Sequence, residues 1–236
     1  MTKPQKKPKE TQKKKTILII CAHSDDQILG AGGTIKKYNE KGYEAHTIIF
    51  SYGELSHFHL KKDYVKEMRI KESEEAENII GGKGITFYDH TDGQIKNETK
   101  TKQTHKLIKQ KINELKPEKI FTHSQDDIHP DHRAVYQTVL DAYNELPKKT
   151  QKNIEIYSFE ISQLWNLKKR KTPVLVIDIT TQFKAKIKAL HAFKSQINIF
   201  SHTYEVNLLY LGVYVRAFIA GLIYKKKLAE IFYKIK

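Results

Sequence analysis

The chain alternates between two patterns of apolar residues. Short runs of aliphatic and β-branched residues predict buried strands, and longer segments with apolar residues at helical spacing lie between them. The expected strands are Ile17–Ala22, Ala45–Phe50, Ile85–Tyr88, Lys119–Thr122, Ile154–Phe159 and Pro173–Ile179. The expected helices are Ile28–Glu40, Tyr64–Ile80, Lys102–Leu115, Asp131–Leu146 and Thr181–Ile197, with later helical pieces that include Lys226–Lys234. This alternation predicts an α/β fold with a mostly parallel sheet covered by helices on both faces.

The first fifteen residues differ in composition from the rest of the chain. Residues 1–15 hold seven lysines and one glutamate, so six of the fifteen net positive charges at pH 7 lie there. Apart from Met1 the segment has no large apolar residue, and such a composition does not order itself. We predict a disordered, solubilising tail, followed by a single domain over residues 16–236, because a chain of this length suits one α/β core.

Cysteine usage and the first apolar run favour a cytoplasmic protein. Cys21 is the single cysteine and lies within Ile17–Ala22, so no internal disulfide can form and we expect a buried thiol. The same apolar run is shorter than the core of a secretory signal peptide.

One later segment, Val206–Tyr224, approaches the length of a membrane span. Asn207 and Arg216 interrupt it, so we favour a buried helix or a helix in a surface seam. Contact with a membrane surface is the less favoured interpretation, although Lys225–Lys227 directly follow and would suit an interface. Nucleic acid is not an expected partner, because no basic cluster alternates with exposed aromatic residues. These patterns do not indicate an oligomeric state.

Polar side chains directly follow the first and fourth expected strands. His23, Asp25 and Asp26 follow the first, and His129–His132 follow the fourth. Parallel strands present their carboxyl ends at one edge of a sheet, where α/β proteins place their sites. His23, Asp26 and His132 would there supply two imidazoles and a carboxylate, as in a catalytic zinc site with one open position. Non-haem iron sites use the same ligand types, so the metal stays open at this point.

The remaining polar residues of the two clusters suit hydrolysis. Asp25 is poorly placed to bind the same ion as Asp26, so it is the expected base for a metal-bound water. His129, as an imidazolium, would stabilise an oxyanion and protonate a leaving nitrogen. Asp131 is expected to hold His129 or His132 in the required tautomer.

These clusters also resemble the motifs of a known family. Ala22–Gln27 reads Ala-His-Ser-Asp-Asp-Gln and resembles the Ala-His-Pro-Asp-Asp-Glu motif of the LmbE/PIG-L-like zinc deacetylases. The sequence of His129–His132, His-Pro-Asp-His, is identical to the second motif of that family. Further similar segments are Ser51–Glu54, Arg69–Glu72, Tyr88–Gly93, Asp178–Thr180, Ser195–Gln196 and Leu228–Phe232, so the resemblance spans about residues 16–232.

The resemblance implies a Rossmann-like three-layer sandwich and a zinc-dependent hydrolase. Its substrate would be an N-acetylated amino sugar, such as an N-acetylglucosamine conjugate, or a related amide. The implied zinc ligands are His23, Asp26 and His132, with Asp25 as base and His129 at the oxyanion-stabilising position, supported by Asp131. The implied substrate-binding residues are Arg69, at the position of the family's motif arginine, and Asp92, at that of a pocket aspartate.

Three positions depart from the family's pattern. Ser24 replaces proline, Gln27 replaces glutamate, and Phe193 stands where many members carry a histidine. Gln27 removes a charge next to the site. If the family's glutamate only braces the loop by hydrogen bonds, an amide can substitute for it. If the charge of that glutamate helps to bind substrate or tunes the metal-bound water, specificity or rate will differ. None of the three is an expected zinc ligand.

Two other functions are compatible with the same clusters. A metal-dependent phosphoesterase would use His and Asp clusters to clamp phosphate, but a two-metal site needs more ligands than the two clusters supply once a base is set aside. A non-catalytic sugar-binding module would keep the fold and the ion without turnover.

Overall fold

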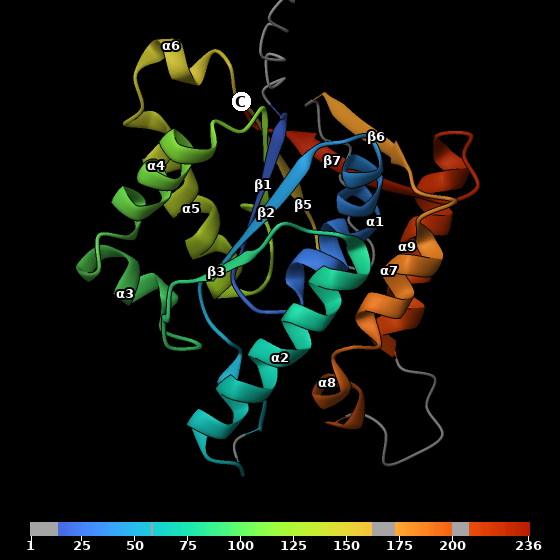
Figure 1. Ribbon diagram of the computed structural model, residues 1–236, viewed down its shortest axis with the longest axis horizontal. Coiled ribbons are helices and arrows are strands. Elements are labelled where there is room, and N and C mark those ends of the chain that lie inside the picture. The colour runs from blue at the N-terminus through green and yellow to red at the C-terminus, as the bar shows by residue number, and fades with distance from the viewer. Residues whose placement is uncertain (1–13, 58, 162–172, 200–207) are drawn as a thin grey trace, which may run out of the picture.

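A seven-stranded sheet forms the middle layer of the protein (Figure 1). The structure is a computed structural model that describes residues 14–57, 59–161, 173–199 and 208–236. The strands are β1 (Thr16–Cys21), β2 (Glu44–Ile49), β3 (Ile85–Phe87), β4 (Lys119–His123), β5 (Glu155–Phe159), β6 (Val174–Asp178) and β7 (Ala229–Lys234). Their order is β3-β2-β1-β4-β5-β7-β6. Strands β1 to β5 pair in parallel, and β7 pairs antiparallel with both β5 and β6. The predicted α/β fold with a mostly parallel sheet is confirmed.

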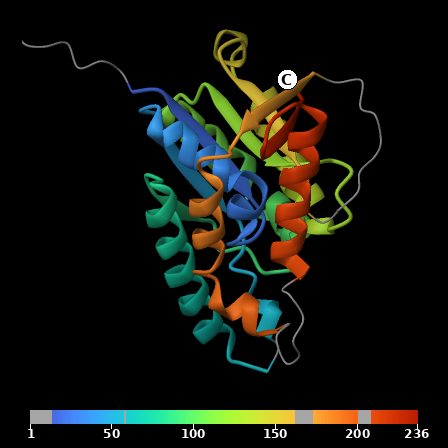
Figure 2. The ribbon, with the colours of Figure 1, turned by 90° about the vertical axis from the view of Figure 1, so that its right-hand side faces the viewer.

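Helices cover both faces of this sheet, as Figures 1 and 2 show. One face carries α1 (Asp26–Glu40), α2 (Lys62–Ile80), α7 (Phe183–Leu190) and α9 (Leu208–Ile223). The other carries α3 (Ile95–Thr101), α4 (Thr104–Leu115) and α5 (Pro130–Asn144). The remaining short helices are η1 (Glu54–His57), α6 (Lys148–Gln151) and α8 (Lys194–Ile199).

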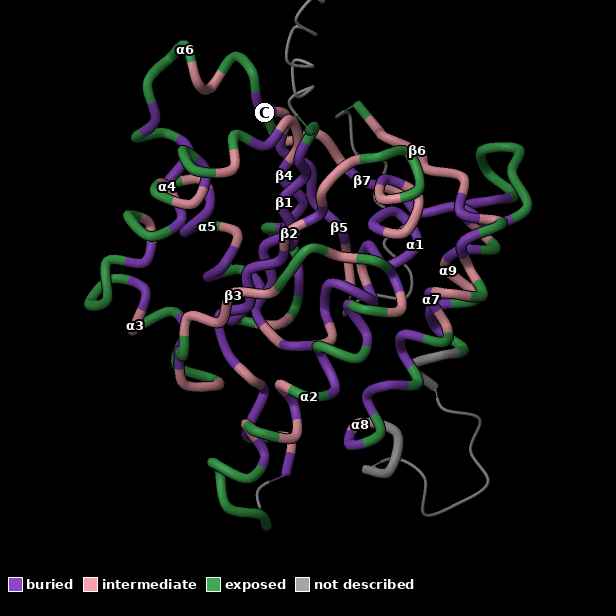
Figure 3. Tube along the Cα trace, in the orientation of Figure 1, coloured by how far each residue is buried: buried purple, intermediate pink, exposed green. Residues whose placement is uncertain are grey.

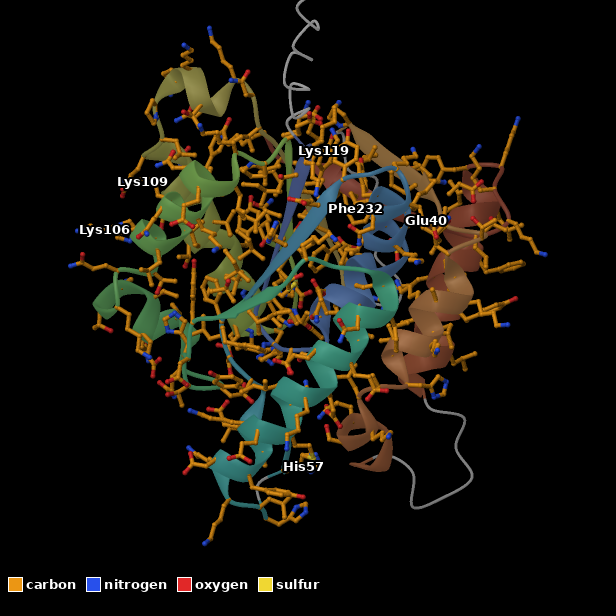
Figure 4. The ribbon with its side chains drawn as sticks, in the orientation of Figure 1. Glu40, His57, Lys106, Lys109, Lys119 and Phe232 are labelled. Atoms are coloured by element: carbon orange, nitrogen blue, oxygen red, sulfur yellow. The ribbon has the colours of Figure 1, made fainter. Side chains whose placement is uncertain are left out.

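Strand β1 lies at the centre of the hydrophobic core, which explains its continuous apolar sequence. Ile17, Ile19 and Cys21 pack under the helices of one face, and Leu18 and Ile20 pack under those of the other. All five side chains are fully buried, and β1 is coloured as buried in Figure 3. Because both faces of a central parallel strand are covered, it shows no alternation of polar and apolar residues. Phe232 of β7 lies in the same core (Figure 4).

Three predicted elements differ in the structure. The expected helix at Lys226–Lys234 was wrong, because Ala229–Lys234 forms β7 between two other strands. The expected helix at Thr181–Ile197 is divided into α7 and α8 by a turn at residues 191–193. Between the expected strand Ile85–Tyr88 and the expected helix Lys102–Leu115, where no element was expected, the chain forms α3. In each case a short apolar pattern did not reveal where the chain changes direction or pairs with a distant strand.

The tail prediction falls mostly on residues 1–13, which lie outside the described residues. Over the ranges that the structure describes, no helix has both the length and the apolar character needed to cross a bilayer.

Candidate metal centre and active site

Three side chains from two distant loops converge where the carboxyl ends of β1 and β4 meet. His23 lies in the loop after β1, Asp26 is the first residue of α1, and His132 lies in the first turn of α5. Asp26 Oδ2 lies 3.4 Å from His23 Nδ1 and 3.4 Å from His132 Nε2. One potential ligand atom from each residue falls within 4.8 Å of the others. The sequence predicted this set of residues, and the structure brings it together.

The electrostatics of this cluster suit a bound cation. Burial opposes the charge of Asp26, but the neighbouring imidazoles of His132 and His123 hold its pKa well below its usual range. Burial alone would lower the pKa of His132, yet Asp26 and Asp127 raise it to about 9. The carboxylates of Asp131, Asp26 and Asp92 likewise outweigh burial and raise the pKa of His23. Without a metal, protonated imidazoles thus supply the positive charge that the buried carboxylates require.

A second observation also fits a metal. His23 Nε2 is buried and makes no hydrogen bond within the described residues, although Asp92 Oδ1 and Asp131 Oδ2 lie 3.3 Å and 3.5 Å away. Those separations are too long or too poorly aligned for strong hydrogen bonds. Two imidazoles and a carboxylate are the donor set of many catalytic zinc sites, so the residues fit zinc.

Asp127 orients His132, and sequence reasoning missed it. Its Oδ1 lies 3.1 Å from His132 Nδ1 and accepts the backbone N–H of His129 at 2.9 Å. A carboxylate on the far nitrogen fixes the ring of a metal-binding histidine and raises its basicity. Asp127 was available as a candidate, because it lies in the same loop as His129–His132.

His123 is the other residue that the sequence did not reveal. It ends β4, and its Nε2 accepts the backbone N–H of Ala22 at 2.9 Å and lies 3.2 Å from Asp26 Oδ2. Its ring stacks on His132, with centroids 3.9 Å apart. Burial and the neighbouring His132 lower its pKa to about 4, so the ring is neutral. His123 therefore ties the ends of β1 and β4 together beneath the cluster.

The predicted base, Asp25, is held by Arg69. Arg69 Nη2 lies 3.4 Å from Asp25 Oδ1, and Arg69 Nε donates to the carbonyl of Tyr52 at 3.0 Å. Arg69 is 1% exposed, and Glu72 lies 3.8 Å from its Nη1. Glu72 in turn accepts the backbone N–H and the hydroxyl of Ser195, both at 2.7 Å. Arg69 thus lies behind Asp25, rather than at an open surface as its predicted substrate contact would suggest.

Asp131 also lies differently from its expected position. Its carboxylate accepts the N–H of Gly93 at 2.8 Å and faces His23, whereas its own backbone N–H donates to His129 Nδ1 at 3.2 Å. His129 is the N-cap of α5 and its ring accepts this N–H, so the two residues are joined through the Asp131 backbone and not through its carboxylate. The ring of His129 is half-buried, 5.0 Å from that of His23 and 4.7 Å from that of His132. Burial and these two imidazoles lower the pKa of His129.

Asp92, which the resemblance implies as a substrate-binding residue, faces His23 of the cluster. Its Oδ1 lies near His23 and its Oδ2 accepts the N–H of Leu55 at 3.1 Å. Gln27 is bonded to its own loop. Its Nε2 donates to the carbonyl of Ser24 at 3.1 Å, and Ser24 donates to the carbonyl of Tyr52 at 2.9 Å. Gln27 and Ser24 thus brace the loop that carries Asp25.

Comparisons with known proteins identify the family of this chain. The PIG-L family profile, whose description is GlcNAc-PI de-N-acetylase, matches residues 18–143, which is more than half of the chain. A probable N-acetyl-alpha-D-glucosaminyl L-malate deacetylase 2 of Bacillus cereus is 25% identical over 186 residues, which cover 76% of this chain and 83% of the relative. The 4-oxalmesaconate hydratase of Pseudomonas putida is 26% identical over 209 residues, which cover 82% and 79%.

Solved structures share the fold at lower identity. N,N'-diacetylchitobiose deacetylase from Pyrococcus horikoshii aligns with a TM-score of 0.76 at 21% identity, over 94% of this chain and 84% of that chain. The 4-carboxy-2-hydroxymuconate hydratase of Pseudomonas putida gives 0.77 at 22% identity, over 94% and 96%. A zinc-inhibited form of a teicoplanin deacetylase gives 0.72 at 16% identity, over 93% and 97%. The profile match confirms the resemblance seen in the motifs, and the chain belongs to the PIG-L/LmbE family of GlcNAc-PI de-N-acetylase-like proteins.

Proposed function

We propose that this protein is a zinc-dependent N-deacetylase acting on an acetylated amino sugar, a glycoconjugate or a related acylated amine. The observation that carries the proposal is the convergence of His23, Asp26 and His132, with a second carboxylate, Asp25, next to the cluster. Zinc is the proposed metal because the donor set fits it and because a deacetylase of the same fold is described in a zinc-inhibited form. When bound, zinc polarises an acyl carbonyl and lowers the pKa of a coordinated water to about 7.

Asp25 is the proposed general base. It immediately precedes Asp26, its side chain retains 14% exposure, and Arg69 fixes one of its oxygens. A carboxylate in this position can accept a proton from water beside the ion. We further propose that Arg69 acts through Asp25 instead of contacting the substrate, because its guanidinium is buried among Asp25, Glu72 and the Tyr52 carbonyl.

His129 is the proposed donor to the oxyanion and to the leaving nitrogen. Since its Nδ1 accepts the N–H of Asp131, a neutral ring carries its proton on Nε2. The centroid of this ring lies 5.0 Å from that of His23 and 4.7 Å from that of His132, the two proposed histidine ligands. A donor at that position stabilises charge that develops on the acyl oxygen. Asp92 is a proposed substrate-binding residue at the edge of the same site.

The hydratase among the relatives makes hydration of a carbon–carbon double bond the second candidate function. The charges around the cluster favour the deacetylase. Asp92 and Asp131 face His23, and Arg69 is engaged by Asp25. A polycarboxylate would meet repulsion from these carboxylates, whereas a neutral acetamide would not.

A substrate screen tests the proposal. The full-length protein, loaded with zinc, is assayed for acetate release from N-acetylated sugars and amines, then assayed again after chelation. We expect release that chelation abolishes and zinc restores. An unsaturated dicarboxylate followed by loss of ultraviolet absorbance provides the hydratase arm, and turnover there without acetate release would contradict the proposal.

Metal content separates the remaining alternatives. Two ions per chain with phosphate ester hydrolysis would favour a phosphoesterase. One ion with sugar binding but no turnover on any substrate would favour a non-catalytic module.

A further inference from the structure

The outer face of α9 is apolar along the part whose side chains are described. Leu211, Tyr214, Phe218 and Leu222 follow one another at spacings of three and four residues, which places them on one side of the helix. Each is between 43% and 63% exposed. Figure 2 shows α9 as an outermost helix on the side that faces the viewer. Ile223, the last residue of α9, and Tyr224, which directly follows the helix, are also exposed.

The opposite face of α9 is packed against the body of the protein. Val213, Ala217 and Ala220 are buried. Arg216, the one charged residue in Leu208–Ile223, turns inward and donates to the carbonyls of Glu160 and Ile161 at 3.0 Å and 2.6 Å. A surface helix normally turns polar residues toward solvent. Here the single charge is on the inner side, and large apolar groups face outward.

A lysine cluster is fixed against the end of this stripe. Lys225–Lys227 are exposed and form a turn directly after Tyr224. The N–H of Lys226 donates to the carbonyl of Gly221 at 2.8 Å. A Cβ at Gly221 would lie 2.6 Å from the carbonyl oxygen of Lys227, so this turn folds back tightly onto the helix. The three lysines therefore keep a defined position beside the apolar stripe.

We propose that the outer face of α9 rests on an anionic lipid surface. The stripe would enter the boundary between headgroups and acyl chains, and Lys225–Lys227 would bind lipid phosphates. The rings of Tyr214 and Tyr224 suit the same interfacial zone. Each lysine close to an anionic surface strengthens binding by about fivefold, and the net charge of +15 attracts the protein to such a surface from a distance.

A second copy of the chain fits this face less well. A two-fold contact places the same patch on both sides of the interface. The sequence from Leu208 to Lys227 contains no aspartate or glutamate, so the lysine cluster of one copy would find no countercharge in the same patch of the other. Lipid phosphates supply the missing negative charge.

Vesicle co-sedimentation of the full-length protein tests the proposal. We expect binding to vesicles with equal amounts of phosphatidylcholine and phosphatidylglycerol, and much weaker binding to phosphatidylcholine alone. Phe218→Ser combined with Leu222→Ser should reduce the partition coefficient at least tenfold, as should Lys225→Glu combined with Lys226→Glu. Leu107→Ser on α4 is the matched control, because Leu107 is an exposed leucine at 45% on a different face of the sandwich.

Circular dichroism verifies that each variant is folded before the vesicle assay. Equal binding by the Phe218→Ser/Leu222→Ser variant and the wild type would overturn the proposal, as would no binding by the wild type. Light scattering without vesicles gives the third outcome. A wild-type dimer that this double variant converts to a monomer would assign the face to a second copy and overturn the lipid surface. None of these measurements depends on catalytic turnover, so they do not rely on the proposed deacetylase activity.

Discussion

Restoring the family's glutamate at position 27 should destabilise this protein. Gln27 is fully buried, and its amide N–H donates to the carbonyl of Ser24 at 3.1 Å. In Gln27→Glu, an ionised carboxylate would face that carbonyl oxygen, which can only accept hydrogen bonds. The new side chain must therefore be protonated to keep the contact, or turn away and lose it.

The structure sets the size of this effect. Keeping a glutamic acid protonated at pH 7, about 2.7 pH units above its reference pKa of about 4.3, takes about 3.7 kcal/mol at 1.36 kcal/mol per unit. Losing the hydrogen bond while leaving a buried polar group unsatisfied takes about 1–3 kcal/mol. Because the side chain adopts the cheaper of these two alternatives, we expect the free energy of unfolding to fall by about 1–3 kcal/mol at pH 7 and by about 1 kcal/mol or less near pH 5.

Urea denaturation of both proteins at pH 5 and pH 7.5, with chelator present throughout, measures this difference. The comparison of variant with wild type cancels the titration of groups that both proteins share. Equal stability of Gln27→Glu and wild type at pH 7.5 would refute the reasoning, because it would mean that the loop around Ser24 offers this carboxylate a donor.

Three further predictions concern residues around the site and in the core. Burial raises the pKa of Glu77 to about 8, so its contribution to stability is full below about pH 4.5 and is lost as the pH rises toward 8; Glu77→Gln should lose less stability than wild type over that range in thermal melts. Asp127→Asn removes the carboxylate beside His132 Nδ1 and should weaken zinc binding by about 10- to 100-fold in a chelator competition. A loss of secondary structure in the circular dichroism spectrum of this variant would instead indicate a purely structural role for Asp127. Gly30→Ala would place a Cβ 2.4 Å from the Phe159 ring and should lower the free energy of unfolding by about 1–3 kcal/mol in urea, whereas an unchanged value would show that the ring moves freely.

The sequence predicted the central part of the fold because the parallel strands have strong local signatures. Strand β1 is apolar from Ile17 to Cys21, and this apolar run stops at His23. The edge shared by β1 and β4 follows from parallel pairing. Strand β7 was missed because its pairing with β5 and β6 depends on strands far away in the sequence. Its buried Glu230 accepts hydrogen bonds from the N–H groups of Gly33 and Thr34, and no pattern within the strand predicts these contacts.

The candidate site shows the same division between local and distant signals. His23, Asp26 and His132 could be predicted because each follows a strand and is a common metal ligand. His123 and Asp127 were missed because their roles lie in contacts across the sheet edge, with Ala22 and with the ring of His132. Arg69 could not be placed from sequence, since its position behind Asp25 depends on how α2 packs against the loop after β1.

Acetate release by the zinc-loaded Asp25→Asn variant tests the central claim most directly. We expect the variant to retain one zinc ion per chain and to lose at least about a hundredfold in turnover on any substrate that the wild type deacetylates. Asp63→Asn, at an exposed carboxylate on α2, is the matched control and should keep full activity. Turnover equal to that of the wild type in Asp25→Asn would show that Asp25 is not the base, and loss of the ion from that variant would show that Asp25 helps to hold the metal.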